Sequence, residues 1–320
     1  MSNGRRSCIR QRVNCKAGWS PTLKKTKPVK TNLSKQRHVL TQLAAAGILD
    51  VFNATYEQGH ELGSGGFGSV YNGVRKSDGL KVAIKHVPKN NVDFHSVDRK
   101  ELLQVPMEVH LMSRAAGGPD KLGQSAAVSL LDWFMLDTEL IIVMERPFPS
   151  MDLLAYSTLH YPLPEDTVRD IMKQLVLAVI DLHKKGVFHR DLKPNNVLIQ
   201  KTEDGIRVRI IDFGHGCVAS AAPHTSILGC LSCAPLEMFL VRQYRDGPTS
   251  VWQIGAMAFN LLNGDGCCFD TSEWVLNKLS MKTSTATEEG KHFVQVCLEN
   301  NPANRMSLEE LAKHPWFSKT

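Results

Sequence analysis

The stretch "HRDLKPNNVL", residues 189–198, and the "DFG" after it hold the side chains that phosphoryl transfer requires. Transfer to a hydroxyl needs an acceptor for the alcohol proton, a positive charge near the moving phosphate and oxygen ligands for magnesium. Asp191 and Lys193 would supply the first two, and Asn196 with Asp212 would bind the metal. Each could be an ordinary loop residue, but their joint order, with a strand between them, predicts a catalytic centre.

A glycine-rich stretch is the candidate phosphate-binding loop. "LGSGGFGSV" runs from Leu62 to Val70. Its spaced glycines are Gly63, Gly65 and Gly68. Such a pattern also occurs in dinucleotide-binding loops, but there it opens directly into a helix. Here strand-like text and "VAIK" follow, which predicts a hairpin covering the phosphates and a phosphate contact by Lys85.

The segment "PMEVHLM" predicts a partner for this lysine. Glu108 lies near the start of a helix that begins after Pro106, so its carboxylate could hold the Lys85 ammonium on the α- and β-phosphates. The alternative is a solvated first-turn acid, which the helix dipole favours.

Two unequal lobes must position these residues. Residues 56–144 alternate or cluster β-branched residues and predict strands, as in "KVAIKHV". The character changes over a link at 145–150, and residues 151–317 are mostly helical. An amphipathic helix there is indicated by apolar residues at helical spacing, namely Val168, Ile171, Met172, Leu175, Val176, Val179 and Ile180. We therefore expect a strand-rich and a helix-rich lobe.

Residues 1–55 form a basic N-terminal extension. The first 49 residues hold 11 Lys/Arg and no acid, and the whole chain has a net charge of +6. We expect disorder here; targeting to the nucleus through "KKTKPVK", contact with an acidic partner, or an organellar transit peptide are the alternatives. Because the basic residues are confined to the extension, a nucleic-acid-binding core is not expected.

Other compositional features indicate an intracellular protein. No run approaches the roughly 18 apolar residues of a membrane span, and the start lacks the apolar core of a secretory signal. We expect a cytoplasmic monomer, with the nucleus as a further location. The eight cysteines are expected as reduced thiols, since "CLSC" has a metal-like spacing but no second ligand pair.

The chain resembles the eukaryotic protein kinases over residues 56–317, on the glycine loop, "VAIK", the helix glutamate, "HRDLKPNN" and "DFG". "CAPLE" stands at the family's A-P-E segment, which implies an ion pair between Glu237 and Arg305. Within the family the chain is most similar to the Pim serine/threonine kinases, on "VPMEV", "LLDWF", "MERPFP", "VWQIG" and "HPWF". The resemblance implies an α+β bilobal kinase fold, with a small antiparallel sheet and regulatory helix followed by a larger helical lobe.

The resemblance also implies how ATP and Mg²⁺ bind. The carbonyl of Glu145 would accept from the adenine amino group, and two residues later Pro147 lacks the N–H that most kinases donate to the ring. We therefore expect one main-chain hydrogen bond to adenine where most kinases make two. Apolar contacts would come from Leu62, Val70, Ala83, Met144 and Ile211.

Three departures from the family pattern bear on activity and specificity. Ser250 stands where most kinases have an aspartate that braces the catalytic loop, and Pim kinases also lack that aspartate. Cys230 replaces a threonine, which implies reduced turnover. Pro194 and Asn195 replace acids of the catalytic loop in basophilic kinases. A preference for basic substrates would then depend on Asp152, Asp265, Asp270 and Glu273.

The activation segment suggests regulation. No acid lies between Asp212 and Glu237, so Arg190 lacks an acidic partner there. We hypothesise that phosphorylation of Thr225 or Ser226 fills this role; the alternative is a segment that stays ordered without modification.

Two functions compete. The first is a serine/threonine kinase that transfers the ATP γ-phosphate to protein hydroxyls, with some preference for basic sequences. The second is a pseudokinase that acts as a binding or scaffold module. The presence of Lys85, Asp191 and Asp212 favours the enzyme.

Overall fold

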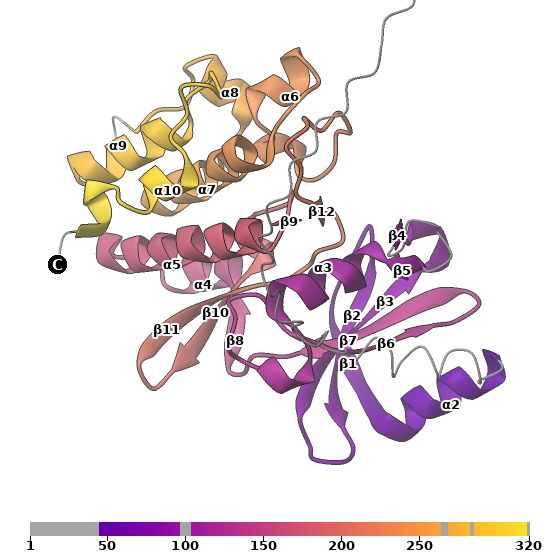
Figure 1. The fold of residues 1–320 in the computed structure, drawn as a ribbon. Coiled ribbons are helices and arrows are strands. Elements are labelled where there is room, and N and C mark those ends of the chain that lie inside the picture. The colour runs from indigo at the N-terminus through magenta and orange to yellow at the C-terminus, as the bar shows by residue number, and fades with distance from the viewer. Residues whose placement is uncertain (1–44, 97–103, 264–267, 282–284, 319–320) are drawn as a thin grey trace, which may run out of the picture. The chain divides into compact units, whose positions relative to one another are not determined.

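The structure is a computed structural model that describes residues 45–96, 104–263, 268–281 and 285–318. Residues 56–145 carry a sheet and one long helix, and most of the helices follow residue 150 (Figure 1). The expected α+β architecture with two lobes is therefore confirmed. The basic extension before residue 45 and the candidate acid Asp265 lie outside the described residues.

The first lobe is built on an antiparallel five-stranded sheet in the order β1-β2-β3-β7-β6. Its strands are β1 (Tyr56–Gly65), β2 (Gly68–Arg75), β3 (Lys81–Pro88), β6 (Leu130–Met135) and β7 (Glu139–Glu145). The short pair β4 (Phe94–Ser96) and β5 (Gln104–Pro106) precedes the helix α3 (Met107–Ala116).

Strand β3 presents its alternate side chains to two different hydrophobic clusters. Val82 and Ile84 pack in one cluster, whereas Ala83 and Val87 belong to the core that continues into the second lobe. Successive side chains of a strand point to opposite faces, so Lys85 shares the face of Ala83. The register pairs Ala83 with Met144 and Lys85 with Val70, so these four side chains lie together on that face of the sheet.

Helix α2 (Ala45–Thr55) covers the other face of the sheet and corrects the expected boundary at residue 55. Phe52 is 4% exposed, and its ring centroid lies 5.5 Å from that of Phe134 on β6. Ile48 is partly buried in the same cluster, as an i, i+4 neighbour of Phe52 on the helix. The first lobe thus includes α2, and the extension ends before residue 45.

The second lobe is mostly helical (Figure 1). Its α-helices are α4 (Leu153–Leu159), α5 (Glu165–Lys184), α6 (Leu236–Leu240), α7 (Asp246–Asn263), α8 (Thr271–Val275), α9 (Glu288–Cys297) and α10 (Leu308–Leu311). Its strands are β8 (Ser150–Asp152), β9 (Val187–Phe188), β10 (Val197–Thr202), β11 (Gly205–Ile210) and β12 (Cys217–Val218). The amphipathic helix predicted around Val168–Ile180 is α5, which buries that apolar face.

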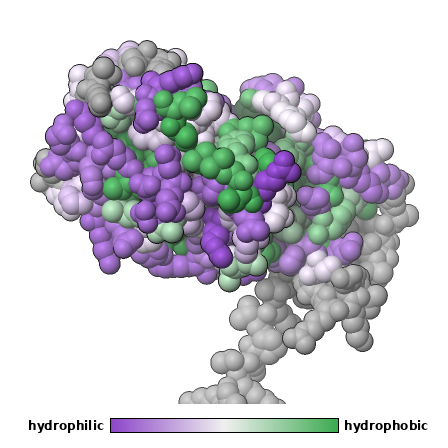
Figure 2. Space-filling model, turned by 90° about the horizontal axis from the view of Figure 1, so that it is seen from above, coloured by the Kyte–Doolittle hydropathy of each residue, from purple (hydrophilic) through white to green (hydrophobic). Residues whose placement is uncertain are grey.

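The surface of the helical lobe is not uniformly polar. Hydrophobic side chains gather in a patch on the face shown in Figure 2. At the end of α6 the exposed fractions are 43% for Phe239, 71% for Leu240 and 64% for Val241. Within the described residues, no helix is long and apolar enough to span a membrane.

Candidate active site

The glycine-rich loop is the turn between β1 and β2, as predicted. Gly63 pairs with Val70, and Gly65 pairs with Gly68, which closes the hairpin. Gly68 has φ +132°, and a Cβ there would lie 1.8 Å from the His86 carbonyl oxygen. Only glycine fits this position, because neither the angle nor the space admits a side chain. Open space surrounds Gly63 and Gly65, where a phosphate chain could approach the backbone.

Lys85 joins two acids from different elements. Its Nζ lies 2.7 Å from Glu108 Oε1 on α3 and 2.7 Å from Asp212 Oδ1. Burial alone would lower the pKa of Lys85, but Glu108 and Asp212 outweigh it and raise the pKa, so the ammonium stays charged. The predicted Lys85–Glu108 pair is therefore formed, and α3 is in the position that an active kinase requires.

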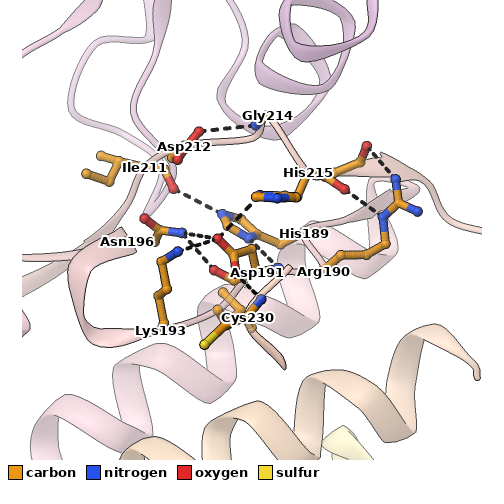
Figure 3. Close-up of polar contacts among 12 residues, drawn as sticks. His189, Arg190, Asp191, Lys193, Asn196, Ile211, Asp212, Gly214, His215 and Cys230 are labelled. Carbon is orange, nitrogen blue, oxygen red and sulfur yellow. Dashed lines mark hydrogen bonds and ion pairs between the residues drawn. The ribbon is translucent and has the colours of Figure 1, made fainter. Parts of the chain in front are cut away.

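Asp191 is the centre of the catalytic loop (Figure 3). Its side chain is fully buried, with Oδ2 2.8 Å from Lys193 Nζ and 3.0 Å from Asn196 Nδ2. Oδ1 accepts a hydrogen bond of 2.9 Å from the Cys230 backbone N–H. Burial alone would raise the pKa of Asp191, but the nearby His215 ring and the Lys193 ammonium hold it below its usual range. A carboxylate ionised at neutral pH can accept a hydroxyl proton.

The oxygen atoms proposed for magnesium fit a hard cation. Asn196 uses its amide nitrogen to donate to Asp191, which leaves the amide oxygen for a metal. Asp212 uses Oδ1 for Lys85 and for the Gly214 N–H, which leaves Oδ2. One carboxylate and one amide oxygen, completed by phosphates and water, are the kind of ligands that Mg²⁺ takes in such sites.

Two non-glycine residues of the candidate site have a left-handed backbone. Arg190 has φ 64° and Asp212 has φ 62°, a region that residues other than glycine rarely adopt. Gly229 also has a positive φ, and a Cβ there would lie 2.8 Å from the Arg190 carbonyl oxygen and 3.3 Å from Asp191 Oδ1. The activation segment can approach Asp191 this closely only because residue 229 is glycine.

Gln253 on α7 braces the catalytic loop, a role that the sequence did not reveal. Its Nε2 donates to the Arg190 carbonyl oxygen at 2.7 Å, and its Oε1 accepts from the Leu192 N–H at 3.3 Å. Ser250, at the position of the family's bracing aspartate, instead lies 3.0 Å from His183 Nε2. Gln253, one helical turn later and 2% exposed, therefore makes the backbone contacts expected near that position.

The substitution Gln253→Leu should lower kcat about tenfold to a hundredfold, because it removes both contacts and lets Asp191 shift relative to the acceptor. The two buried backbone groups would lose their partner, at a cost of about 1–3 kcal/mol each. Steady-state kinetics and thermal melting measure the two effects. Ser250→Ala is the matched control on the same helix, and equal kcat values for both variants would contradict a bracing role for Gln253.

The hinge carries a buried ion pair that the sequence analysis missed. Arg209 on β11 is 1% exposed in its side chain, and its Nη1 and Nη2 lie 2.9 Å and 2.8 Å from the Glu145 carboxylate oxygens. Oε2 of Glu145 also accepts from the Ser129 N–H at 3.1 Å. An arginine inside the apolar run "RVRIID" was the available signal, because a charged residue in a buried strand needs a partner.

His215, directly after "DFG", is a second missed residue. Its Nδ1 lies 3.4 Å from Asp191 Oδ2, and its ring centroid lies 4.3 Å from that of Phe67 in the glycine-rich loop. It thus contacts Asp191, as Figure 3 shows, and also the glycine-rich loop through Phe67. Only the position next to "DFG" could have marked it in advance.

The other expected contacts have mixed outcomes. The Glu237–Arg305 pair is confirmed, with Nη1 and Nη2 at 2.8 Å and 2.9 Å from the carboxylate. Arg190 donates to the carbonyl oxygens of His215 and Gly216, and its Nη1 lies 3.4 Å from Ser226 Oγ. Phosphorylation of Thr225 or Ser226 stays a prediction.

The predicted apolar adenine contacts are partly brought together. Val70, Ala83, Met144 and Ile211 belong to one hydrophobic cluster, and Leu62 at the start of the loop is 46% exposed. Of the candidate acids for basic substrates, Asp152 accepts from the Ala155 N–H and Asp270 from the Ser272 N–H, so both cap helices. Glu273 lies in the first turn of α8.

This geometry defines the class of protein: the chain belongs to the protein kinase domain family, whose model matches residues 56–317. A protein of Danio rerio named serine/threonine-protein kinase pim-2 is 34% identical over 272 residues, which cover 84% of this chain and 86% of the relative. The serine/threonine-protein kinase prk-2 of Caenorhabditis elegans is 31% identical over 84% of this chain and 59% of its own length. The serine/threonine-protein kinase 36 of Pongo abelii is 32% identical over 80% of this chain and 19% of the relative. The resemblance to the Pim kinases is confirmed by these matches.

Proposed function

We propose that this protein is an active serine/threonine kinase that transfers the γ-phosphate of ATP to hydroxyls of protein substrates. The observation that carries the proposal is the arrangement of Asp191, which lies buried and ionised beside Lys193, while Lys85 is paired with Glu108. A base placed to accept the hydroxyl proton and a formed lysine–glutamate pair are two of the parts that phosphoryl transfer in a kinase site requires. The related serine/threonine kinases support the choice of acceptor.

In this mechanism each side chain has one task. The glycine-rich loop covers the triphosphate, and the Lys85 ammonium contacts its α- and β-phosphates. Asn196 and Asp212 would hold Mg²⁺, which would neutralise charge on the transferred phosphoryl group. Asp191 orients the substrate hydroxyl and accepts its proton, and Lys193 stabilises negative charge at the phosphoryl oxygens.

The rival function is a pseudokinase, and incorporation of radiolabelled γ-phosphate from ATP into a library of serine and threonine peptides separates the two. We expect transfer that depends on Mg²⁺ and is absent in Asp191→Asn. A labelled signal that is equal in the wild-type protein and this variant would remove the enzyme proposal.

We further propose that basic peptides are the better substrates. Asp152, Asp270 and Glu273 keep negative charge at the start of α4 and α8, even though two of them also cap helices. The exposed apolar side chains at the end of α6 add a surface of the kind that contacts proteins. The intracellular location, the monomeric state and the absence of nucleic-acid binding stay predictions.

Replacing Pro147 by alanine should strengthen ATP binding, because it restores a hinge N–H that can donate to the adenine ring. A net hydrogen bond contributes about 0.5–1.5 kcal/mol, so we expect the Kd for ATP to fall about two- to tenfold. Isothermal titration calorimetry measures this change. The control is an ATP analogue that has carbon in place of the ring nitrogen expected to accept this hydrogen bond. Its Kd should be the same for the wild-type protein and the variant. An unchanged Kd for ATP itself would contradict the proposed hinge geometry.

A further inference from the structure

Two cysteines that share a contact with Ser232 lie in the segment that donates to Asp191. Cys230 precedes the single 3₁₀ turn η4 (Leu231–Cys233), and Cys233 ends it. Side chains three residues apart lie above one another in such a turn. Ser232 Oγ bridges them, at 3.1 Å from Cys230 Sγ and 3.9 Å from Cys233 Sγ. Both thiols are free in the structure, with Cys230 partly exposed and Cys233 8% exposed.

The two thiols differ in acidity. Interaction with the neighbouring Cys233 thiol lowers the pKa of Cys230 to about 5, against burial and the Asp191 charge. The same interaction, together with burial, raises the pKa of Cys233. Burial alone would lower the pKa of Lys193, but the Asp191 carboxylate and, to a smaller extent, the Cys230 thiolate raise it. A partly exposed thiolate next to a protonated thiol is the arrangement of an attacking and a resolving cysteine.

We propose that Cys230 and Cys233 are a redox-sensitive dithiol that hydroperoxides convert to an intramolecular disulfide. The Cys230 thiolate attacks one peroxide oxygen, the O–O bond breaks, and an alkoxide or hydroxide leaves and takes a proton from water. The Cys230 sulfenic acid is then attacked by Cys233 sulfur, which forms the S–S bond. The thiol proton of Cys233 leaves with the sulfenic hydroxyl as water. Each thiol loses one electron, and the peroxide gains two.

Oxidation at this place would act on catalysis. The Cys230 N–H donates to Asp191 Oδ1 at 2.9 Å, and Thr271 Oγ1 donates to the carbonyl oxygens of Ser232 and Ala234 at 3.1 Å and 2.8 Å. A bond between the two sulfurs would restrain the backbone that makes these contacts. It would also remove the negative charge of the Cys230 thiolate near Lys193. Disulfides inside cells are usually transient and redox-sensing, which suits a reversible switch.

The test treats the full-length reduced protein with a small excess of hydrogen peroxide, blocks the remaining thiols with N-ethylmaleimide and maps peptides by mass spectrometry. We expect a peptide in which Cys230 and Cys233 have lost two hydrogens and escaped alkylation, while the exposed Cys268 is still alkylated. Dithiothreitol should reduce the disulfide, so that N-ethylmaleimide again alkylates both cysteines. In Cys233→Ser, Cys230 should stop at a sulfenic acid that dimedone traps, and in Cys230→Ser, Cys233 should remain a thiol.

The outcomes separate this inference from the proposed function. The disulfide is read from peptide masses and needs no kinase activity, whereas a reversible loss of activity by about tenfold or more rests on the proposed function. The proposal of a redox-sensitive dithiol is wrong if Cys230 and Cys233 are both still alkylated after peroxide treatment. It is also wrong if Cys268 is oxidised to the same extent as they are. A disulfide that forms without changing the turnover of an active enzyme would overturn its effect on catalysis.

Discussion

Replacing Asp191 by asparagine is expected to lower kcat by about 10²–10⁴-fold, which is the usual contribution of a positioned general acid or base. The variant keeps the shape of the side chain and an oxygen that can accept from the Cys230 N–H. It removes the negative charge that Lys193 contacts at 2.8 Å and the atom that would accept the substrate proton. Steady-state phosphate transfer at saturating ATP measures the loss.

The same change at Asp204 is the matched control, because this residue is exposed in the turn between β10 and β11. We expect Asp204→Asn to keep the wild-type kcat. Binding of ATP by Asp191→Asn, measured by calorimetry, should change little, since Lys85, Asn196 and Asp212 are intact. Nearly full turnover by Asp191→Asn would show that Asp191 is not the base and would return the pseudokinase or another proton acceptor to consideration.

Arg209→Met is expected to destabilise the fold by about 3–5 kcal/mol, the usual cost of removing one partner of a buried ion pair. The Glu145 side chain is 12% exposed and would keep its charge without its arginine partner, with backbone N–H groups such as that of Ser129 still donating to it. For a domain of this size the loss corresponds to a fall in Tm of about 6–20 °C. Thermal denaturation, with unfolding in urea as a second measurement, tests it.

A double variant makes the origin of this loss clear. Removing both charges in Arg209→Met with Glu145→Gln should recover much of the stability, because no uncompensated buried charge remains. The interaction energy from the four proteins should then lie at or above about 1 kcal/mol. Additive effects of the two substitutions would mean that Arg209 acts by packing its side chain, without a measurable charge interaction.

The sequence was sufficient for those parts of the site that lie close together along the chain. Asp191, Lys193 and Asn196 fall within six residues, so one loop brings them together in any fold that keeps the motif. The two lobes were also readable, since strand and helix periodicity and the family motifs agree over residues 56–317. Even the Lys85–Glu108 and Glu237–Arg305 pairs followed from the resemblance, because the family fixes which segments meet.

Contacts between distant residues without a motif needed the folded chain. Gln253 reaches a carbonyl oxygen 63 positions earlier, and Arg209 reaches a carboxylate 64 positions earlier. Such pairs depend on how helices and strands pack and on which rotamers fit, and local periodicity does not contain either. Helix α2 was assigned to the extension for the same reason, because packing of Phe52 against Phe134 stabilises this helix only once the sheet has formed.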